Sequence, residues 1–152
     1  MKAARRAAIE KASRAKSWGV VLGTLGRQGN PHILTHVQAR LASRGLPHSV
    51  VLLSEISPAK IAALRGPDAW VQIACPRLSI DWGEAFAVPV LTPYEAEVAL
   101  GALPGWWQAA DGETAASEAR ESCGKERPYP MSYYEQGSGP YNSCYQPQRV
   151  KT

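Results

Sequence analysis

Three times along this chain, a residue that can cap a helix stands directly before a proline: Asn30–Pro31, Ser57–Pro58 and Thr92–Pro93. A capping side chain followed by proline at the first helical position is a strong signal for the start of an α-helix. Each pair also follows a short apolar stretch with many β-branched residues, as expected of a buried strand. This alternation of strands and helices predicts an α/β fold.

The apolar stretches indicate a parallel sheet. We expect four strands, at residues 18–23 (WGVVLG), 48–54 (HSVVLLS), 69–74 (AWVQIA) and 88–91 (VPVL). They are apolar along their whole length, which is typical of strands that helices cover on both faces. Because parallel crossovers are almost always right-handed, the simplest arrangement is a doubly wound sheet with strand order 2-1-3-4.

The division of the chain follows from composition. Residues 2–16 are rich in alanine and contain no glycine or proline, which predicts a further helix. We expect one α/β domain over residues 1–101. Beyond it Pro, Gly, Ser, Tyr and Glu dominate, so residues 102–152 are expected to form a mostly irregular or disordered tail, with Trp106 and Trp107 packed back on the domain.

Composition also excludes several classes of protein. No apolar run is long enough to span a membrane, and the first residues lack the apolar segment of a secretory signal. Three cysteines are too few for a disulfide scaffold, so we expect a reducing, cytoplasmic location. The net charge of +4 comes from residues 1–16, which hold six Lys/Arg and one acidic residue. The charge therefore predicts no nucleic-acid-binding surface over the domain, and leaves only a basic arm as an alternative.

Two loops are expected to meet at the carboxyl edge of the predicted sheet. In the order 2-1-3-4 the loops after the first and third strands lie side by side, where doubly wound sheets bind ligands. The first, TLGRQGN (residues 24–30), opens a helix, and its free N–H groups favour an anion. The second begins with Cys75, Pro76 and Arg77. An arginine beside a thiol favours the thiolate, which binds soft metals and iron–sulfur clusters.

Each of these features has a simpler interpretation. The loop matches neither the Walker sequence nor G-x-G-x-x-G, so a plain strand-to-helix turn fits it as well as a ligand site does. Cys75 can be a small buried hydrophobe, and Arg77 can pair with Asp81 at the surface. The residues by themselves leave both interpretations open.

Two further pairs of polar residues are weaker candidates. His32 and His36 have a helical spacing that can bind zinc, but no third ligand is evident, and a solvated helix face is the better interpretation. Glu95 and Glu97 are expected to be exposed residues of the last predicted helix. Neither pair is expected to form a site.

Several long segments resemble the third domain of the first catalytic subunit of eukaryotic diphthamide synthases. The resemblance covers roughly residues 3–100 and resumes at residues 128–134. It rests on SWGVVLGTLGRQGNPHIL, LLSEISPAKIAAL, WVQIACPRLSIDWGEAF and PVLTPYEAEVAL, in this order along the chain, followed by YPMSYY. Motifs of this length in a fixed order are far more specific than a single glycine loop.

The resemblance implies a 2-(3-amino-3-carboxypropyl)histidine synthase, which carries out the first step of diphthamide formation on a histidine of translation elongation factor 2. It implies a radical transferase in which a 4Fe-4S cluster supplies the electron that cleaves S-adenosylmethionine, generating a 3-amino-3-carboxypropyl radical. The implied partners are the second synthase subunit, in a heterodimer, a small iron-binding electron donor and the elongation factor. No membrane and no direct nucleic-acid contact are implied.

The resemblance also assigns roles to residues at the crevice. Cys75, in the motif ACPR, corresponds to the cysteine that the third domain contributes to the cluster. The fourth iron is left open for the methionine part of S-adenosylmethionine. The residues that would face the cluster or the amino acid part of S-adenosylmethionine are Arg77, Gly23, Thr24, Gly26, Arg27, Gln28 and Gly29.

The chain departs from the family pattern in its extent. Segments that match the first two domains are missing, and with them two of the three cysteine ligands. Cys123 and Cys144 lie outside the family motifs, and ordering a tail to deliver them would cost entropy. Because one thiolate cannot hold a four-iron cluster, we expect a fragment, an alternative product or an incomplete gene model that is inactive alone. Two alternatives remain: a non-catalytic module that binds the partner subunit, and a free-standing domain that binds a small anion or nucleotide at GTLGRQG.

Overall fold

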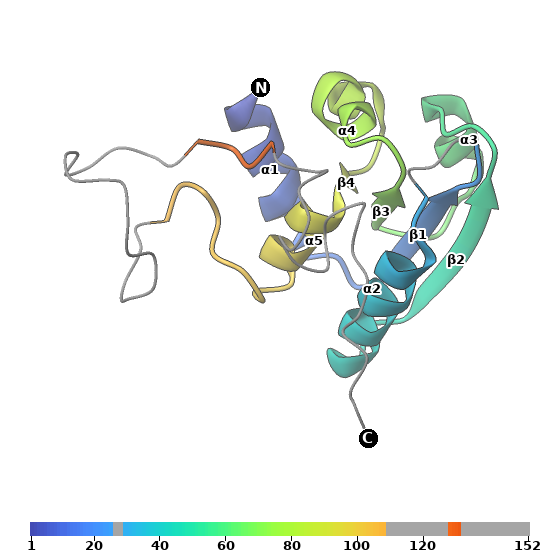
Figure 1. Cartoon of the computed structure of the whole chain (residues 1–152), viewed down its shortest axis with the longest axis horizontal. Coiled ribbons are helices and arrows are strands. Elements are labelled where there is room, and N and C mark those ends of the chain that lie inside the picture. The colour runs from blue at the N-terminus through green and yellow to red at the C-terminus, as the bar shows by residue number, and fades with distance from the viewer. Residues whose placement is uncertain (26–28, 109–127, 132–152) are drawn as a thin grey trace.

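The strands pair as the sequence predicts. In the computed structural model, which describes residues 1–25, 29–108 and 128–131, four strands form one parallel sheet in the order β2-β1-β3-β4 (Figure 1). The strands are β1 (Trp18–Gly23), β2 (His48–Leu53), β3 (Ala69–Ile73) and β4 (Val90–Leu91). The predicted doubly wound sheet, including its order, is confirmed.

Each of the three cap–proline pairs begins a helix. Asn30 accepts a hydrogen bond from the His32 N–H at 2.9 Å. Ser57 caps the next helix, and Thr92 forms a capping box with Glu95. The helical elements are α1 (Lys2–Ala12), α2 (Pro31–Ser43), α3 (Pro58–Ala63), α4 (Arg77–Trp82), the 3-10 turn η1 (Gly83–Ala85) and α5 (Pro93–Ala99). Two of these elements, α4 and η1, are not predicted from the sequence, and α1 is shorter than expected. None of the described helices is long and apolar enough to cross a membrane.

Helices cover both faces of the sheet (Figure 1). Val20 of β1 faces α1 and α2, where it shares a buried cluster with Ile9 and Val37. Val21 faces the opposite side, where it shares a second cluster with Ile61 of α3. Because alternate residues of β1 enter different apolar layers, the whole strand is buried and its sequence is apolar throughout.

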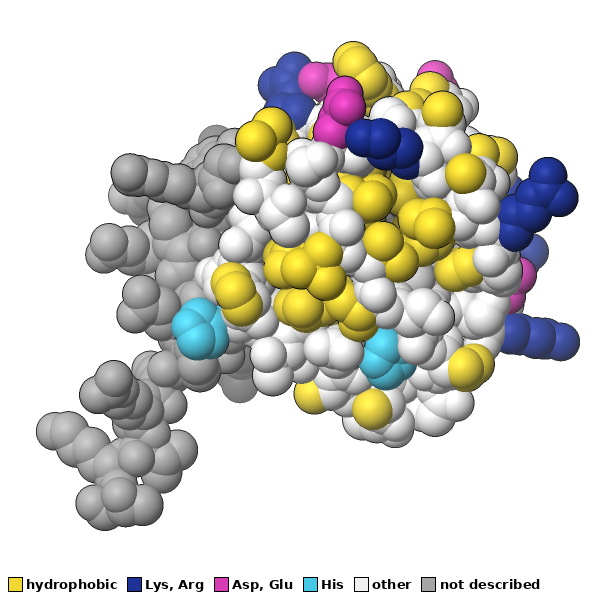
Figure 2. All heavy atoms as spheres, turned by 90° about the vertical axis from the view of Figure 1, so that its right-hand side faces the viewer, with side chains coloured by type: hydrophobic (Ala, Val, Ile, Leu, Met, Phe, Trp, Pro, Cys, Tyr) yellow, Lys and Arg dark blue, Asp and Glu magenta, His cyan; other side chains and the backbone are white. Residues whose placement is uncertain are grey.

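The prediction of a buried strand at residues 48–54 is wrong. The strand found there, β2, lies at the edge of the sheet, and its side chains are half-buried or exposed, with Leu52 61% exposed. An edge strand has a neighbour on one side only. Leu52 pairs with Leu22 on the face that α1 and α2 cover, but it is not part of the buried cluster on that face. Figure 2 shows hydrophobic side chains gathered near the centre of this side of the molecule.

The apolar core continues past residue 101. Trp106 and Tyr129 are almost fully buried and belong to the same cluster as Ile9. Their two rings meet edge to face, with centroids 4.8 Å apart. The domain boundary at residue 101 and the tail over residues 102–152 stay predictions.

Candidate functional site

The two predicted loops leave the sheet side by side. Leu22 of β1 is paired with Ile73 of β3, and the residues that follow them, Gly23 and Ala74, are in contact. A Cβ atom on Gly23 would lie 2.8 Å from that of Ala74, which is closer than real Cβ atoms approach, so this position requires glycine. Cys75 comes directly after Ala74. The register therefore places it at the mouth of the crevice, beside the end of β1.

Cys75 lies in the turn between β3 and α4. Its carbonyl oxygen accepts a hydrogen bond from the Leu78 N–H at 3.1 Å, which closes the turn into the helix. Pro76 follows, with φ held at −56° by its ring. Cys75 is half-buried and its thiol is free, so the sulfur is able to bind a metal ion or cluster. Cys123 and Cys144 lie outside the described residues.

The glycine loop folds back on the end of β1. A Cβ atom on Gly29 would collide with the carbonyl oxygen of Gly23, so the loop returns to the residue where it started. The N–H of Thr24 donates to the last carbonyl of β2 at 2.9 Å and is not free to bind an anion, whereas its side chain is exposed. Three loop residues with a predicted role lie outside the described residues: Gly26, Arg27 and Gln28.

Arg77 forms an ion pair within α4. Its Nε donates to Oδ2 of Asp81 at 2.7 Å, and the two side chains are 64% and 39% exposed. This hydrogen bond raises the pKa of Arg77, so the guanidinium remains charged. The pair is the surface interaction that the sequence offers as the simpler interpretation. A role for Arg77 in binding S-adenosylmethionine stays a prediction.

A buried amide lies beside Cys75, and the sequence does not predict its contacts. Gln72 of β3 is fully buried. Its Nε2 donates to the Cys75 carbonyl oxygen at 3.0 Å and to the Ser79 hydroxyl oxygen at 3.2 Å. Ser79, on α4, is fully buried as well. The available signal is a single polar residue inside a strand that is otherwise apolar.

The prediction that Glu95 and Glu97 are exposed is wrong. Glu95 is fully buried and Glu97 is 4% exposed, because α5 packs against α1 and the sheet. Glu95 accepts two hydrogen bonds from Arg5, at 2.8 and 2.6 Å, and one from the Tyr129 hydroxyl at 2.8 Å. These carboxylates hold helices together rather than face solvent.

The histidine pair does not assemble a metal site. His32 is exposed, whereas His36 turns toward α5 and places its Nε2 2.9 Å from Oε1 of Glu97. The interpretation of a solvated helix face is therefore wrong for His36. Nε of Arg40 lies 3.2 Å from the other oxygen of Glu97 without hydrogen-bond geometry, so that contact is electrostatic. Among the described residues, no three His, Cys, Asp or Glu side chains gather as metal ligands.

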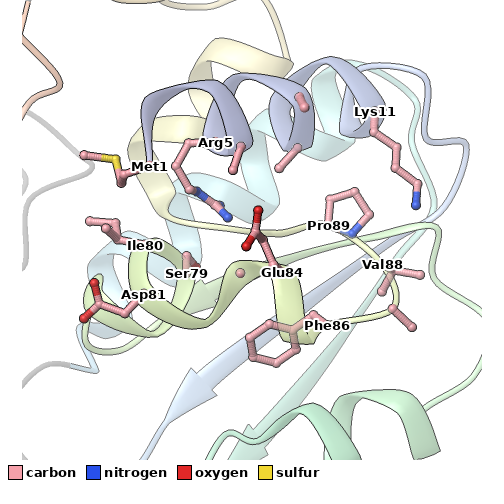
Figure 3. Close-up of a pocket in the computed structure, with 15 residues that line it drawn as sticks. Met1, Arg5, Lys11, Ser79, Ile80, Asp81, Glu84, Phe86, Val88 and Pro89 are labelled. Atoms are coloured by element: carbon pink, nitrogen blue, oxygen red, sulfur yellow. The ribbon is translucent and has the colours of Figure 1, made fainter.

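A separate pocket of about 510 Å³ lies beside α1. Figure 3 shows Arg5 and Lys11 reaching toward it from α1, with Glu84 and Phe86 on the opposite side. The guanidinium of Arg5 is already bonded to Glu95 and to the carbonyl oxygen of Val90. None of the predicted site residues lines this pocket, so the candidate site is the crevice at Cys75.

Together, these observations define a doubly wound α/β domain with a free thiol at the carboxyl edge of its parallel sheet. Residues 1–111 match the family described as putative diphthamide synthesis protein, and the chain belongs to that family. The resemblance seen in the sequence is confirmed.

Its curated relatives carry one name. The chain is 52% identical over 144 residues to the chicken (Gallus gallus) 2-(3-amino-3-carboxypropyl)histidine synthase subunit 1. The aligned residues cover 94% of this chain and 30% of the chicken protein. Identity to the human (Homo sapiens) protein of the same name is 51% over 142 residues, which are 93% of this chain and 28% of the human protein. The chain thus spans about 30% of the length of the curated relatives it matches.

The fold also matches a solved structure. The crystal structure of Dph2 from Pyrococcus horikoshii with a 4Fe-4S cluster superposes with a TM-score of 0.60 and 29% sequence identity. The match covers 66% of this chain and 28% of that chain. A second crystal structure of the same protein gives a TM-score of 0.61 at 28% identity. This match covers 78% of this chain and 33% of that chain.

Proposed function

We propose that this chain supplies one ligand, Cys75, to a 4Fe-4S cluster in a 2-(3-amino-3-carboxypropyl)histidine synthase. The observation that carries the proposal is the free, half-buried thiol at the crevice of a chain whose solved relative contains such a cluster. The site fits a shared cluster, since thiolates are the usual ligands of such a cluster and the described residues offer a single one. The other ligands would come from parts of the synthase that this chain does not span.

The reaction we propose is transfer of a 3-amino-3-carboxypropyl group from S-adenosylmethionine to a histidine of translation elongation factor 2, in the cytoplasm. 5′-Methylthioadenosine is the leaving group, and the new bond replaces a hydrogen of the imidazole ring, which is lost as a proton. The names of the relatives support the group and the acceptor residue type. When bound, a 4Fe-4S cluster would supply the electron that cleaves S-adenosylmethionine. The partners in this proposal are the second synthase subunit, a small iron-binding electron donor and the elongation factor.

Within the described part of the chain, three groups are available for this task. Cys75 offers its sulfur to iron. Arg77 offers a charged guanidinium that can exchange its exposed partner Asp81 for a substrate carboxylate, because exposed ion pairs are weak. Thr24 offers its exposed hydroxyl, since its N–H is already bonded to β2. With one suitable thiolate among its described residues, the chain is not expected to catalyse alone.

The test is anaerobic reconstitution with iron and sulfide. We would compare the isolated chain with a chimera in which the matched part of the chicken subunit 1 is replaced by residues 1–152. We expect stable cluster absorbance in the chimera only, and its loss in the Cys75→Ser chimera. The control is a Cys123→Ser, Cys144→Ser chimera, which should keep the cluster. A Cys75→Ser chimera with undiminished cluster absorbance would show that Cys75 is not a ligand.

A second candidate is a non-catalytic interaction module. It is favoured by the edge strand β2, where Leu52 is 61% exposed, and by the hydrophobic side chains that gather near the centre of this side of the molecule (Figure 2). An exposed apolar group of this kind often marks a binding surface. Co-purification of the chain with the second synthase subunit, without cluster absorbance in any chimera, would favour this candidate.

A further inference from the structure

Gln72 is an unusual residue for its position. Val71 and Ile73 belong to the cluster under α1 and α2, so Gln72 points to the opposite face, into the layer that contains Trp70 and Leu78. Its side chain is fully buried there. Burying an amide among apolar groups is unfavourable unless hydrogen bonds replace those to water. The contacts of this amide therefore indicate what it does.

The Cys75 carbonyl fixes the orientation of the amide. A carbonyl oxygen can only accept, so the group of Gln72 that faces it must be the nitrogen. Both N–H groups of Nε2 are then used, one for Cys75 and one for the Ser79 hydroxyl. Oε1 is left buried with no partner among the described residues. The side chain is thus held by its two donor bonds, although they leave its own acceptor unsatisfied.

The backbone of Cys75 is restrained from three directions. Leu78 donates to its carbonyl oxygen from α4, and Gln72 donates to the same oxygen from β3. The ring of Pro76 restricts the backbone of the residue before it. The thiol takes no part in these contacts and remains free. The direction of the Cα–Cβ bond of Cys75 is therefore set through the backbone, while the sulfur itself stays available.

We propose that Gln72 and Ser79 form a clamp that positions Cys75 for binding to the cluster. The clamp is defined as the Gln72 amide with its two acceptors, the Cys75 carbonyl and the Ser79 hydroxyl. This inference rests on the proposed function of Cys75 as a ligand. A ligand sulfur must be held within a fraction of an ångström of its binding geometry, and residues that orient a metal ligand are worth about 10–100-fold in metal affinity.

A purely structural role for Gln72 predicts a different outcome. Gln72→Leu replaces the amide with an apolar group of similar size in an apolar layer and removes the unsatisfied acceptor. This variant removes only one partner of each hydrogen bond and leaves the buried Ser79 hydroxyl without its donor, so it lowers stability. A purely structural role predicts this loss of stability alone, with cluster loss at the wild-type rate. If Gln72 positions Cys75, the same variant weakens cluster binding while the fold is retained. Stability and cluster retention therefore separate the two roles.

The experiment uses the chicken chimera that contains residues 1–152. Reconstituted wild-type and Gln72→Leu chimeras are challenged with an iron chelator, and cluster absorbance and the electron paramagnetic resonance signal are followed. We expect cluster loss about 10–100-fold faster in the variant. Far-ultraviolet circular dichroism and thermal unfolding check that both chimeras are folded. The matched control is Gln38→Leu, the same change at a half-buried glutamine of α2, which should behave as wild type.

The outcomes distinguish this inference from the proposed function. If Cys75→Ser removes the cluster and Gln72→Leu loses it at the wild-type rate, the clamp is overturned and the ligand assignment stands. If Cys75→Ser keeps the cluster, the proposed function fails. Should the Gln72→Leu chimera not fold, Ser79→Ala gives the second test, since it removes one of the two acceptors of the amide. We expect it to speed cluster loss severalfold, and a wild-type rate would overturn the clamp.

Discussion

Two buried polar networks in this domain differ in how completely they are satisfied. The α5 network consists of Arg5, Thr92, Glu95 and Tyr129, and it gives each oxygen of Glu95 two donors. Oε1 accepts from Arg5 and Tyr129, and Oε2 accepts from Arg5 and the Thr92 N–H. The clamp at the crevice leaves Oε1 of Gln72 without a partner among the described residues. The saturated network contributes to stability, and the unsaturated one lies where we propose that function resides.

The strongest test of this comparison removes the centre of the α5 network. Glu95→Ala leaves the Arg5 charge buried without its carboxylate, and we expect a loss of about 3–5 kcal/mol in the free energy of unfolding. Urea denaturation of the 152-residue chain measures it. The control is Glu10→Ala, which breaks the exposed Arg6–Glu10 pair and should cost only about 0.2–0.5 kcal/mol. Equal effects of the two variants would show that the buried network is worth no more than an exposed ion pair.

A smaller change removes one donor from the same network. Tyr129→Phe keeps the aromatic ring but deletes the hydroxyl that donates to Glu95 at 2.8 Å. Hydrogen bonds to charged groups contribute about 1.5–3 kcal/mol, and we expect a loss in this range by urea denaturation. Met131→Ala, in the same segment but half exposed, should change stability by less than about 0.5 kcal/mol.

At the crevice, a substitution should change the free energy of unfolding, measured by urea denaturation, only slightly. Cys75→Ser changes one atom of a half-buried side chain whose thiol is free, so we expect less than about 1 kcal/mol in the free energy of unfolding. The same variant should abolish cluster binding in the chimera. A stability loss as large as that of Glu95→Ala would place Cys75 among the structural residues instead.

The smallest effect concerns an exposed carboxylate that belongs to neither network. The N–H of Lys16, together with the hydroxyl and N–H of Ser17, holds the pKa of Asp68 below its usual value of 3.8. A lowered pKa stabilises the folded state above the unfolded pKa, and this contribution is lost as the pH falls through the folded value. Asp68→Asn should therefore lower Tm slightly at pH 7, and the difference from wild type should vanish in strong acid. A difference that is independent of pH would rule out this origin.

Local signals account for much of the fold. The cap–proline pairs at Asn30, Ser57 and Thr92 predict three helix starts, and apolar strands predict the parallel sheet. The sheet order in turn places Cys75 at the crevice beside Gly23. These predictions succeed because each depends on neighbours in the sequence or on a general rule of handedness.

The failures share a physical cause. Glu95 reads as an exposed helix residue because its main partner, Arg5, is 90 positions away. Likewise β2 is predicted to be buried because it is apolar, and its composition does not show that it lies at the edge of the sheet. Gln72 stands out as a polar residue in an apolar strand, but the adjacent sequence does not predict that the Cys75 carbonyl is its hydrogen-bond acceptor. Contacts between distant segments decide burial, and a single sequence does not contain them.

The hydroxyl of Tyr129 has a consequence for anyone who shortens this protein. A version ended after residue 101, where composition first changes, would lose both this donor and the indole of Trp106 from the hydrophobic core. In the truncated chain, the buried carboxylate of Glu95 would have one hydrogen-bond donor fewer. Experiments on such a truncation would report on a weakened domain.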